Sequence, residues 1–501
     1  MNKLKIGWAE IDITPDKKTY LEGQFAERIS EYVEKPITAT ALAVEAGGEQ
    51  MVLVSCDLVG TPKILVEAVR EKLADNTVGL DPMKTVYSAT HIHTGPSFPN
   101  GTSLSEKGKG HSEKGILLEA LPEGKKYISL ADAAGRDDVI NPQDYFVFLT
   151  DCLAKVTLEA WNKRAEGSYT TAFGRAAVGL NRRAVYTDGS AKMWGDTNTA
   201  SFYELEGGSD SGIELMYTFG EGGKLTGIIA NLACPAQCVQ HRLFVSPDFW
   251  GEVKVLLRKH FGEDIFLLCQ CSNAGDQCPV DLVRWTEPES DLNDPNIYRA
   301  NPPMRKADPS MFDLAGMRKT GRRIANEIIA VYDDGLDAPI GEAEFKHEIV
   351  DMPLPLRKVT PADVKEAKRE LREYVQAKVG DFDYNDIGNL NGCLGVLMRE
   401  RVQEHTEVVH IESHIIRLGN IAFATNPFEA FLVYGNQIKA RSRAEQTFIV
   451  QLANGVENYL PSEKAEKGGH YSAWAASGTV GHIGGEQMVR QTLEVINNLF
   501  E

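Results

Sequence analysis

The residues of the sequence best suited to metal binding or acid–base chemistry are two histidines separated by one residue. The segment 88–96 reads SATHIHTGP and closes an apolar stretch of the kind that forms a β-strand. Residues i and i+2 of a strand project from the same face, so His91 and His93 are expected to point together. Paired imidazoles at a strand end can hold a divalent metal, or a metal and an acid–base group. A hydrogen-bonded pair of surface histidines explains the motif alone equally well.

A second polar turn follows another apolar stretch. Residues 273–279 read NAGDQCP and come directly after the strand-like segment Ile265–Cys269. A Gly-Asp turn ending in proline exposes its side chains at the end of a strand. Asp276 and Cys278 are therefore candidate catalytic residues, and Gln277 is a candidate substrate contact. A simple turn is the structural alternative.

Two further segments place single polar residues at element ends. In Thr425–Phe431, Glu429 is expected in the first turn of a helix, where the helix dipole favours a carboxylate that can also reach a metal. In Asn454–Pro461, a turn carries Tyr459 out of a strand. Capping explains a lone glutamate, and packing explains a lone tyrosine.

Taken in chain order, these segments resemble the neutral, non-lysosomal ceramidase family. The opening GWAEIDITP (7–15), VSCDL (54–58) and GLNR (179–182) resemble further motifs of that family. The matches run in order across nearly the whole chain. Ordered matches at several strand ends are more specific than any single motif.

The resemblance implies one catalytic Zn²⁺ held by two histidines, a glutamate and a tyrosine. Residue by residue, His91, Glu429 and Tyr459 fall on ligand positions. His93 falls on the accessory histidine beside the reacting carbonyl, and Arg182 falls on an active-site arginine that orients the substrate. The implied reaction is metal-dependent hydrolysis, in which metal-activated water cleaves the amide of a small soluble substrate. Asp57 is a candidate partner for a ligating histidine.

The sequence departs from the family at two important positions. Cys234 stands where a second histidine ligand is expected, and a thiolate is a good zinc ligand. His241 could replace it, or the zinc could be absent. Cys278 stands where the family has a serine, so a metal-independent thiol hydrolase is an alternative. A non-catalytic, ligand-binding descendant is another.

Alternating strand and helix patterns predict an α/β fold, with mixed β-sheets flanked by helices in a layered ceramidase-like catalytic domain. Strands are expected at Lys5–Ile13, Met51–Asp57, Thr85–His93, Thr170–Leu180, Gly212–Phe219, Leu225–Ala233, Asp264–Cys271, His414–Thr425 and Thr447–Leu452. Helices are expected at Lys63–Asp75, Tyr145–Arg164, Phe249–Phe261, Asp313–Tyr332, Pro361–Val379, Leu394–Glu404, Phe428–Ser442 and Gly485–Phe500.

We expect residues 1–501 to form a single catalytic domain, without the C-terminal immunoglobulin-like domain of true ceramidases. The Gly-rich, charged segment 102–142 shows little periodicity and is expected to be a long loop or lid.

The composition and net charge of the chain limit the kinds of molecule that it is expected to bind. The 501 residues are 43% hydrophobic and carry a formal net charge of −18, which disfavours nucleic acid and anionic membranes. No apolar run approaches a membrane span, and the N-terminal apolar run is too short for a signal peptide. We therefore expect a cytoplasmic protein with no membrane insertion and a small-molecule substrate. The eight cysteines do not form a disulfide framework. The oligomeric state stays open.

Overall fold

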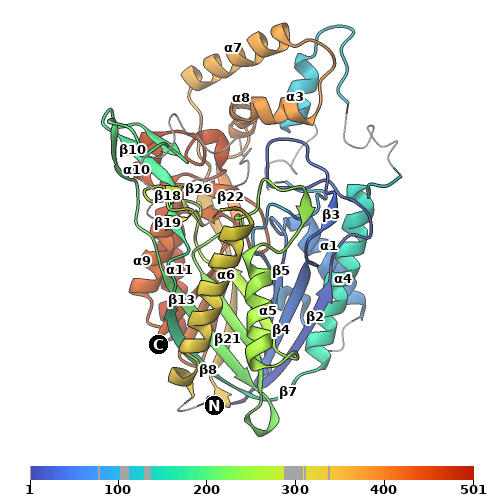
Figure 1. The fold of residues 1–501 in the computed structure, drawn as a ribbon, viewed down its shortest axis with the longest axis vertical. Coiled ribbons are helices and arrows are strands. Elements are labelled where there is room, and N and C mark those ends of the chain that lie inside the picture. Colours follow the sequence, from blue (N-terminus) through green and yellow to red (C-terminus); the bar gives the residue numbers. More distant parts are fainter. Residues whose placement is uncertain are drawn as a thin grey trace.

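The computed structural model describes residues 2–76, 79–101, 112–128, 137–286, 308–309, 312–336 and 339–501. Its body consists of three sheets with helices on their outer faces, and a group of helices lies above one end (Figure 1).

The first sheet has five strands in the order β6-β5-β4-β2-β7. Their bounds are β2 Lys5–Asp12, β4 Thr38–Ala46, β5 Glu49–Cys56, β6 Thr85–Ala89 and β7 Ala165–Glu166. Helices α1 (Lys63–Asn76) and α4 (Pro142–Asn162) cover one face. The strand β4 contributes small alanines to that face and Leu42 and Val44 to the other, the alternation expected of a strand buried on both sides.

The second sheet has the order β16-β14-β13-β8, and the third has the order β21-β22-β23-β25. In the second, β8 is Ser168–Arg175, β13 Gly212–Phe219, β14 Leu225–Leu232 and β16 Phe266–Cys271, covered by α5 (Phe249–Phe261) and α6 (Asp313–Ala330). In the third, β21 is Phe345–Pro355, β22 Val408–Leu418, β23 Ile421–Thr425 and β25 Gln446–Val450, covered by α9 (Leu432–Arg441) and α11 (His482–Leu499).

The three sheets share one inner core. It contains apolar side chains from the first, second and third sheets, including Trp8, Leu42, Met216, Phe423 and Phe448. Because each sheet buries one face here and the other under its helices, the layers hold one another in place. The α/β fold class with mixed sheets and flanking helices is therefore confirmed.

A pair of helices, α7 (Pro361–Ala377) and α8 (Tyr384–Gln403), lies with α3 (Glu113–Ala120) above the sheets (Figure 1). Thr360 caps α7, and Thr360 and Asp363 form a capping box. The segment 102–142, expected to lack regular structure, contains α3, which packs on α8. Its residues 102–111 and 129–136 lie outside the described part of the chain, and its lid role stays a prediction.

Most predicted elements are found within a few residues of their expected bounds, but the helix expected at Leu394–Glu404 begins at Tyr384 as α8, and β4 and β21 were missed. The strand β4 reads TATALAVEA, in which alanine and threonine dilute the apolar signal. The run expected at His414–Thr425 is a hairpin of β22 and β23, because Gly419 has a φ of 59° and turns the chain.

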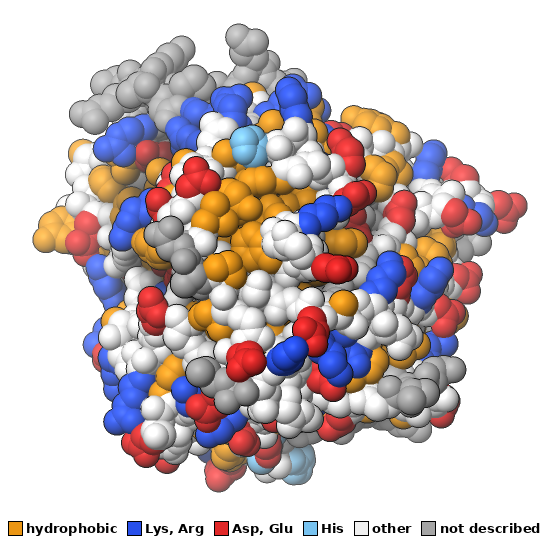
Figure 2. All heavy atoms as spheres, turned by 90° about the horizontal axis from the view of Figure 1, so that it is seen from below, with side chains coloured by type: hydrophobic (Ala, Val, Ile, Leu, Met, Phe, Trp, Pro, Cys, Tyr) orange, Lys and Arg blue, Asp and Glu red, His pale blue; other side chains and the backbone are white. Residues whose placement is uncertain are grey.

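Parallel pairing decides where the loops meet. The pairs β5 with β6, β14 with β16, and β23 with β25 are parallel, so the loops after their carboxyl ends gather at one edge of each sheet. The end of the molecule opposite the helices α3, α7 and α8 is seen from below in Figure 2. It shows hydrophobic side chains surrounded by a mixture of basic and acidic ones. No helix in the described ranges combines the length and apolar character needed to cross a membrane.

Candidate functional site

The histidine pair lies just beyond the end of β6. The strand stops at Ala89, and His91 has a φ of 64°, so the prediction that both histidines lie on the strand is wrong. The turn still brings the rings together, with their Nε2 atoms 3.4 Å apart. Nδ1 of His91 lies 2.7 Å from the carbonyl oxygen of Val59. Since a carbonyl only accepts, Nδ1 of His91 carries a proton, and Nε2 points toward Glu429.

Glu429 and Tyr459 are brought together by a short pair of parallel strands. Glu429 opens β24 (Glu429–Ala430), Tyr459 opens β26 (Tyr459–Leu460), and the two residues are register partners. The expectation that Glu429 lies in the first turn of a helix is wrong, because the chain pairs with β26 before α9 begins at Leu432. Neighbouring strands lie about 4.8 Å apart, so backbone pairing fixes the separation of the two side chains.

Gly275 allows this strand pair to pack against the turn after β16. A Cβ atom at this position would lie 2.2 Å from the carbonyl oxygen of Glu429. The amide of Gly275 also donates to the carbonyl of Ala430 at 2.9 Å. The glycine is therefore required by close backbone approach.

Arg182 joins the carboxylate and the phenol. Its Nη2 lies 3.3 Å from the hydroxyl of Tyr459 and 4.0 Å from Oε2 of Glu429. Oε2 of Glu429 is in turn 3.2 Å from Nε2 of His91. The structure thus brings together His91, Glu429, Tyr459 and Arg182, four residues that come from separate segments of the chain.

Gln237 links His93 to this group. Its Oε1 accepts from Nη1 of Arg182 at 3.0 Å, which orients its Nε2 toward Nε2 of His93 at 2.9 Å. Nε2 of His93 therefore accepts, and Nδ1 carries the proton. That Nδ1 is buried without a hydrogen-bond partner among the described residues. It faces Gly23, where a Cβ would lie 2.9 Å from it.

The site is buried, and burial and neighbouring charges shift the pKa values of its ionisable groups. Burial raises the pKa of Glu429, but the neighbouring His91 and Arg182 outweigh it, so the net pKa is lowered. Burial, followed by the charge of Glu429, raises the pKa of Tyr459. Burial also lowers the pKa of His93 well below its usual range, with His91 contributing. At neutral pH the site therefore holds a carboxylate, a phenol and a neutral His93.

The donor set is chemically suited to zinc. Nε2 of His91 lies 3.2 Å from a carboxylate oxygen of Glu429, a separation that would let both atoms bind one cation. Two ligands of one tetrahedral zinc lie about 3.3 Å apart. The described residues contain no group of three or more His, Cys, Asp or Glu side chains that could hold a metal ion, so the third donor beside His91 and Glu429 would be the phenol oxygen of Tyr459.

The two candidates for the missing ligand make other contacts. The thiol of Cys234 is fully buried and donates to the carbonyls of Val178 at 3.4 Å and Pro235 at 3.7 Å. Burial raises its pKa well above the usual range, which favours the neutral thiol over the thiolate. His241 stacks on Phe312 with ring centroids 5.2 Å apart. Ligation by either residue stays a prediction.

The turn after β16 positions its neighbours. Asp276 accepts from the amide of Leu432 at 2.8 Å and from Asn181 at 2.9 Å, so both carboxylate oxygens are engaged. Gln277 donates to the carbonyl of Gly208 at 3.1 Å. These contacts tie the turn to the start of α9 and to the segment that carries Arg182.

Cys278 is enclosed by apolar side chains. Its thiol donates to the carbonyl of Val280 at 3.3 Å. Burial raises its pKa to about 12, only partly opposed by Arg182. Such surroundings favour a neutral thiol over the thiolate that a cysteine nucleophile needs.

Sequence reasoning missed Gln237, Tyr471 and Arg183. The hydroxyl of Tyr471 is hydrogen-bonded to that of Tyr459. Arg183 is completely buried and donates to the carbonyl of Tyr471 at 3.0 Å. Gln237 could have been suspected as a polar residue three positions after Cys234, and Arg183 because it directly follows Arg182, but Tyr471 lies in a segment without a local signal.

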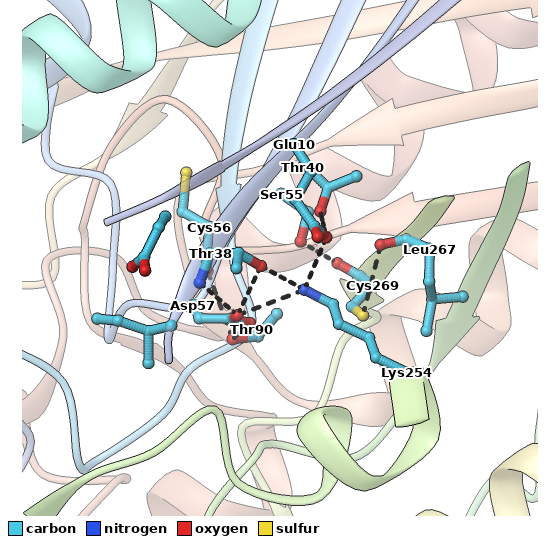
Figure 3. Close-up of polar contacts among 12 residues, drawn as sticks. Glu10, Thr38, Thr40, Ser55, Cys56, Asp57, Thr90, Lys254, Leu267 and Cys269 are labelled. Atoms are coloured by element: carbon cyan, nitrogen blue, oxygen red, sulfur yellow. Dashed lines mark hydrogen bonds and ion pairs between the residues drawn. The ribbon is translucent and has the colours of Figure 1, made fainter. Parts of the chain in front are cut away.

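Asp57 does not contact His91. Its carboxylate instead accepts from the amide of Thr38 at 2.9 Å and lies 3.5 Å from Nζ of Lys254 (Figure 3). Lys254 comes from α5 and also lies 3.5 Å from Glu10 on β2. The network joins α5 to the first sheet directly behind Thr90 and the histidine pair.

No family model matches the chain, and no curated protein matches it in sequence. Solved ceramidase structures share its fold. A neutral ceramidase from Pseudomonas aeruginosa superimposes with a TM-score of 0.66 at 15% identity, covering 100% of this chain and 75% of that chain. A ceramidase complexed with C2 gives a TM-score of 0.65 at 12% identity, covering 100% and 76%. The fold is ceramidase-like, as the sequence resemblance predicted.

Proposed function

We propose that the protein is a zinc-dependent hydrolase that cleaves the amide bond of a small N-acyl substrate. The observation that carries the proposal is the convergence of His91, Glu429, Tyr459 and Arg182, linked by contacts of 3.2 to 4.0 Å. Such buried, coupled ionisable groups are typical of catalytic sites. That both structural neighbours are ceramidases supports an amide as the bond cleaved.

The residues that would hold zinc are His91, Glu429 and Tyr459. Zinc bound there would polarise a carbonyl and lower the pKa of a water molecule, supplying hydroxide near neutral pH. The carbonyl of Val59 fixes the imidazole of His91 with Nε2 toward the site. The pairing of β24 with β26 fixes the two oxygen donors before any ligand binds.

Arg182 and His93 would act on the substrate. Arg182 is buried and cationic beside the phenol of Tyr459, so it can stabilise negative charge that develops on the carbonyl oxygen. His93 is neutral and turns its Nε2 toward His91 and the proposed reaction site, so it can accept a hydrogen bond there. Gln237 is hydrogen-bonded to both His93 and Arg182 and so fixes their relative positions.

The test combines metal analysis with turnover. Purified protein is expected to contain about one zinc per chain and to hydrolyse members of an N-acyl amide panel, and a chelator is expected to abolish turnover. His91→Ala is expected to lose both zinc and turnover, whereas His405→Ala, which changes an exposed histidine, is expected to lose neither. Chelator-insensitive turnover by metal-free protein would overturn the mechanism.

The zinc content of Cys234→Ala tests separately whether Cys234 is a ligand. If its thiolate completes the zinc site, Cys234→Ala lowers zinc affinity by about tenfold or more. If the thiol only packs against Val178 and Pro235, zinc content is unchanged. The main proposal stands on the other three donors in either case.

A further inference from the structure

A small cavity opens beside the proposed catalytic site. Its volume is about 180 Å³, and it lies between α8 and the loop before α11. Phe25, Trp194, Tyr471 and Trp474 provide aromatic walls, and Asn391 and His470 provide polar groups. Trp474 and Phe25 are 45% and 37% exposed, whereas Trp194 is 3% exposed, so the cavity has an open side and a buried floor.

Two walls of the cavity are joined to catalytic residues. The ring of Tyr471 meets that of Tyr459 edge to face with centroids 5.4 Å apart, and their hydroxyls are hydrogen-bonded. The amide of Trp194 donates to the carbonyl of Arg182 at 2.7 Å. The cavity is therefore bordered by two residues, Tyr471 and Trp194, that are hydrogen-bonded to Tyr459 and Arg182.

Residues in and beside the cavity wall have positive φ angles, a backbone conformation that residues other than glycine rarely adopt. Trp194, His470 and Ser472 have φ values of 57°, 71° and 72°. Arg183 fixes this loop by donating to the carbonyl of Gly469 at 2.7 Å and to the hydroxyl of Ser472 at 3.1 Å. Residues held in sparsely populated backbone regions cluster at functional sites.

The lining residues set the chemistry of the occupant. None of the lining residues is Asp, Glu, Lys or Arg, so a charged group would lose its hydration without gaining an ionic partner. Nδ1 of His470 accepts from the amide of Met193 at 3.2 Å, which places the proton on Nε2. Aromatic faces with polar groups between them suit a ring with apolar faces and polar edges.

The volume limits the size of that ring. The cavity volume of 180 Å³ is about six times the roughly 30 Å³ that one water molecule occupies in the liquid, which is room for one small ring and its substituents. A long acyl or sphingoid chain does not fit within it.

We propose that this cavity is the subsite for an uncharged six-membered ring with hydrogen-bonding edges, the chemistry of a pyranose. Resting on the proposed hydrolase function, this assigns the substrate class as an N-acylated amino sugar, with the sugar ring in the cavity and the amide beside Tyr459.

Gly392 offers a precise way to narrow the cavity. It lies within α8, and a Cβ there would meet Trp474 at 3.6 Å, an ordinary contact. Gly392→Ala is therefore expected to preserve or raise the melting temperature, because alanine favours the helix. Gly341→Ala is the matched control, because its Cβ meets nothing closer than 3.9 Å and Gly341 does not line the cavity.

The experiment uses the zinc-loaded full chain. Methyl glucoside, which cannot be hydrolysed here, should quench tryptophan fluorescence, and N-acetylglucosamine should be turned over in preference to N-acetylglycine and N-hexadecanoylsphingosine. Gly392→Ala should raise the KM for N-acetylglucosamine about tenfold, leave turnover of N-methylacetamide unchanged, and weaken the fluorescence response. The control should match the wild type.

The outcomes separate the two proposals. Saturable quenching by methyl glucoside, weakened by Gly392→Ala but without turnover of any amide, would support the subsite and overturn the hydrolase. Turnover of amides with no preference for a ring and no effect of Gly392→Ala would support the hydrolase and overturn the subsite.

Discussion

Lys254 should contribute strongly to stability, because its ammonium group is buried between two carboxylates. Nζ lies 3.5 Å from both Asp57 and Glu10, and the side chain of Lys254 is 9% exposed (Figure 3). At an effective dielectric constant of about 20, each contact corresponds to roughly 5 kcal/mol of gross attraction. Desolvation offsets much of this, and removing one partner of a buried pair typically costs about 3–5 kcal/mol.

Lys254→Met should therefore lower the free energy of unfolding by about 3–5 kcal/mol. Glu10 keeps a second cation, because Nη2 of Arg258 lies 2.7 Å from it. Among the described residues, Asp57 keeps only neutral donors, including the amide of Thr38 at 2.9 Å. Most of the loss should therefore come from Asp57, and the double variant Asp57→Asn/Lys254→Met should recover part of it.

The assay is chemical denaturation followed by circular dichroism, with Lys259→Met as control. Lys259 is an exposed lysine on the same helix, so its substitution should change stability by less than about 0.5 kcal/mol. The reasoning is refuted if Lys254→Met is as stable as the control. It is also refuted if the double variant is destabilised by the sum of its two single changes, since that would show no coupling.

Three further predictions concern the site. Gly275→Ala should displace Glu429, because the added Cβ would lie 2.2 Å from the carbonyl oxygen of Glu429. We expect at least a hundredfold loss of kcat/KM. Wild-type activity of this variant would contradict the required close approach of the two backbones. Cys278→Ala should retain turnover within about tenfold in steady-state kinetics, because burial raises the thiol pKa to about 12; complete loss in a folded variant would favour a cysteine nucleophile. Burial lowers the pKa of His470 from 6.5 to about 4, so the folded state binds fewer protons than the unfolded state and stability should rise with pH between these values. His470→Gln should flatten that part of the melting-temperature profile, and an unchanged slope would show that other groups control it.

The sequence alone determined the chemistry of several site residues. His91 and His93 could be identified because a short polar motif follows an apolar strand, a pattern that depends only on local order. The fold class followed from the alternation of apolar periods, which reflects which faces must be buried. Glu429 and Tyr459 were identified through their family resemblance, since neither position has a distinctive local signal.

Tertiary structure decided how these residues meet. Glu429 was expected on a helix, but a two-residue strand pairs it with Tyr459, thirty positions later (459 − 429), and no local pattern encodes a pairing that short. The partner of His91 is the carbonyl of Val59, and backbone carbonyls carry no sequence signature. Gln237 reaches the site because β14 ends at the same edge as its parallel neighbour β16, and Tyr471 reaches it because Arg183 holds the loop after Gly468 beside Tyr459. Residue type and order fix which groups are available, whereas pairing between distant strands fixes which of them touch, because that pairing depends on the whole core.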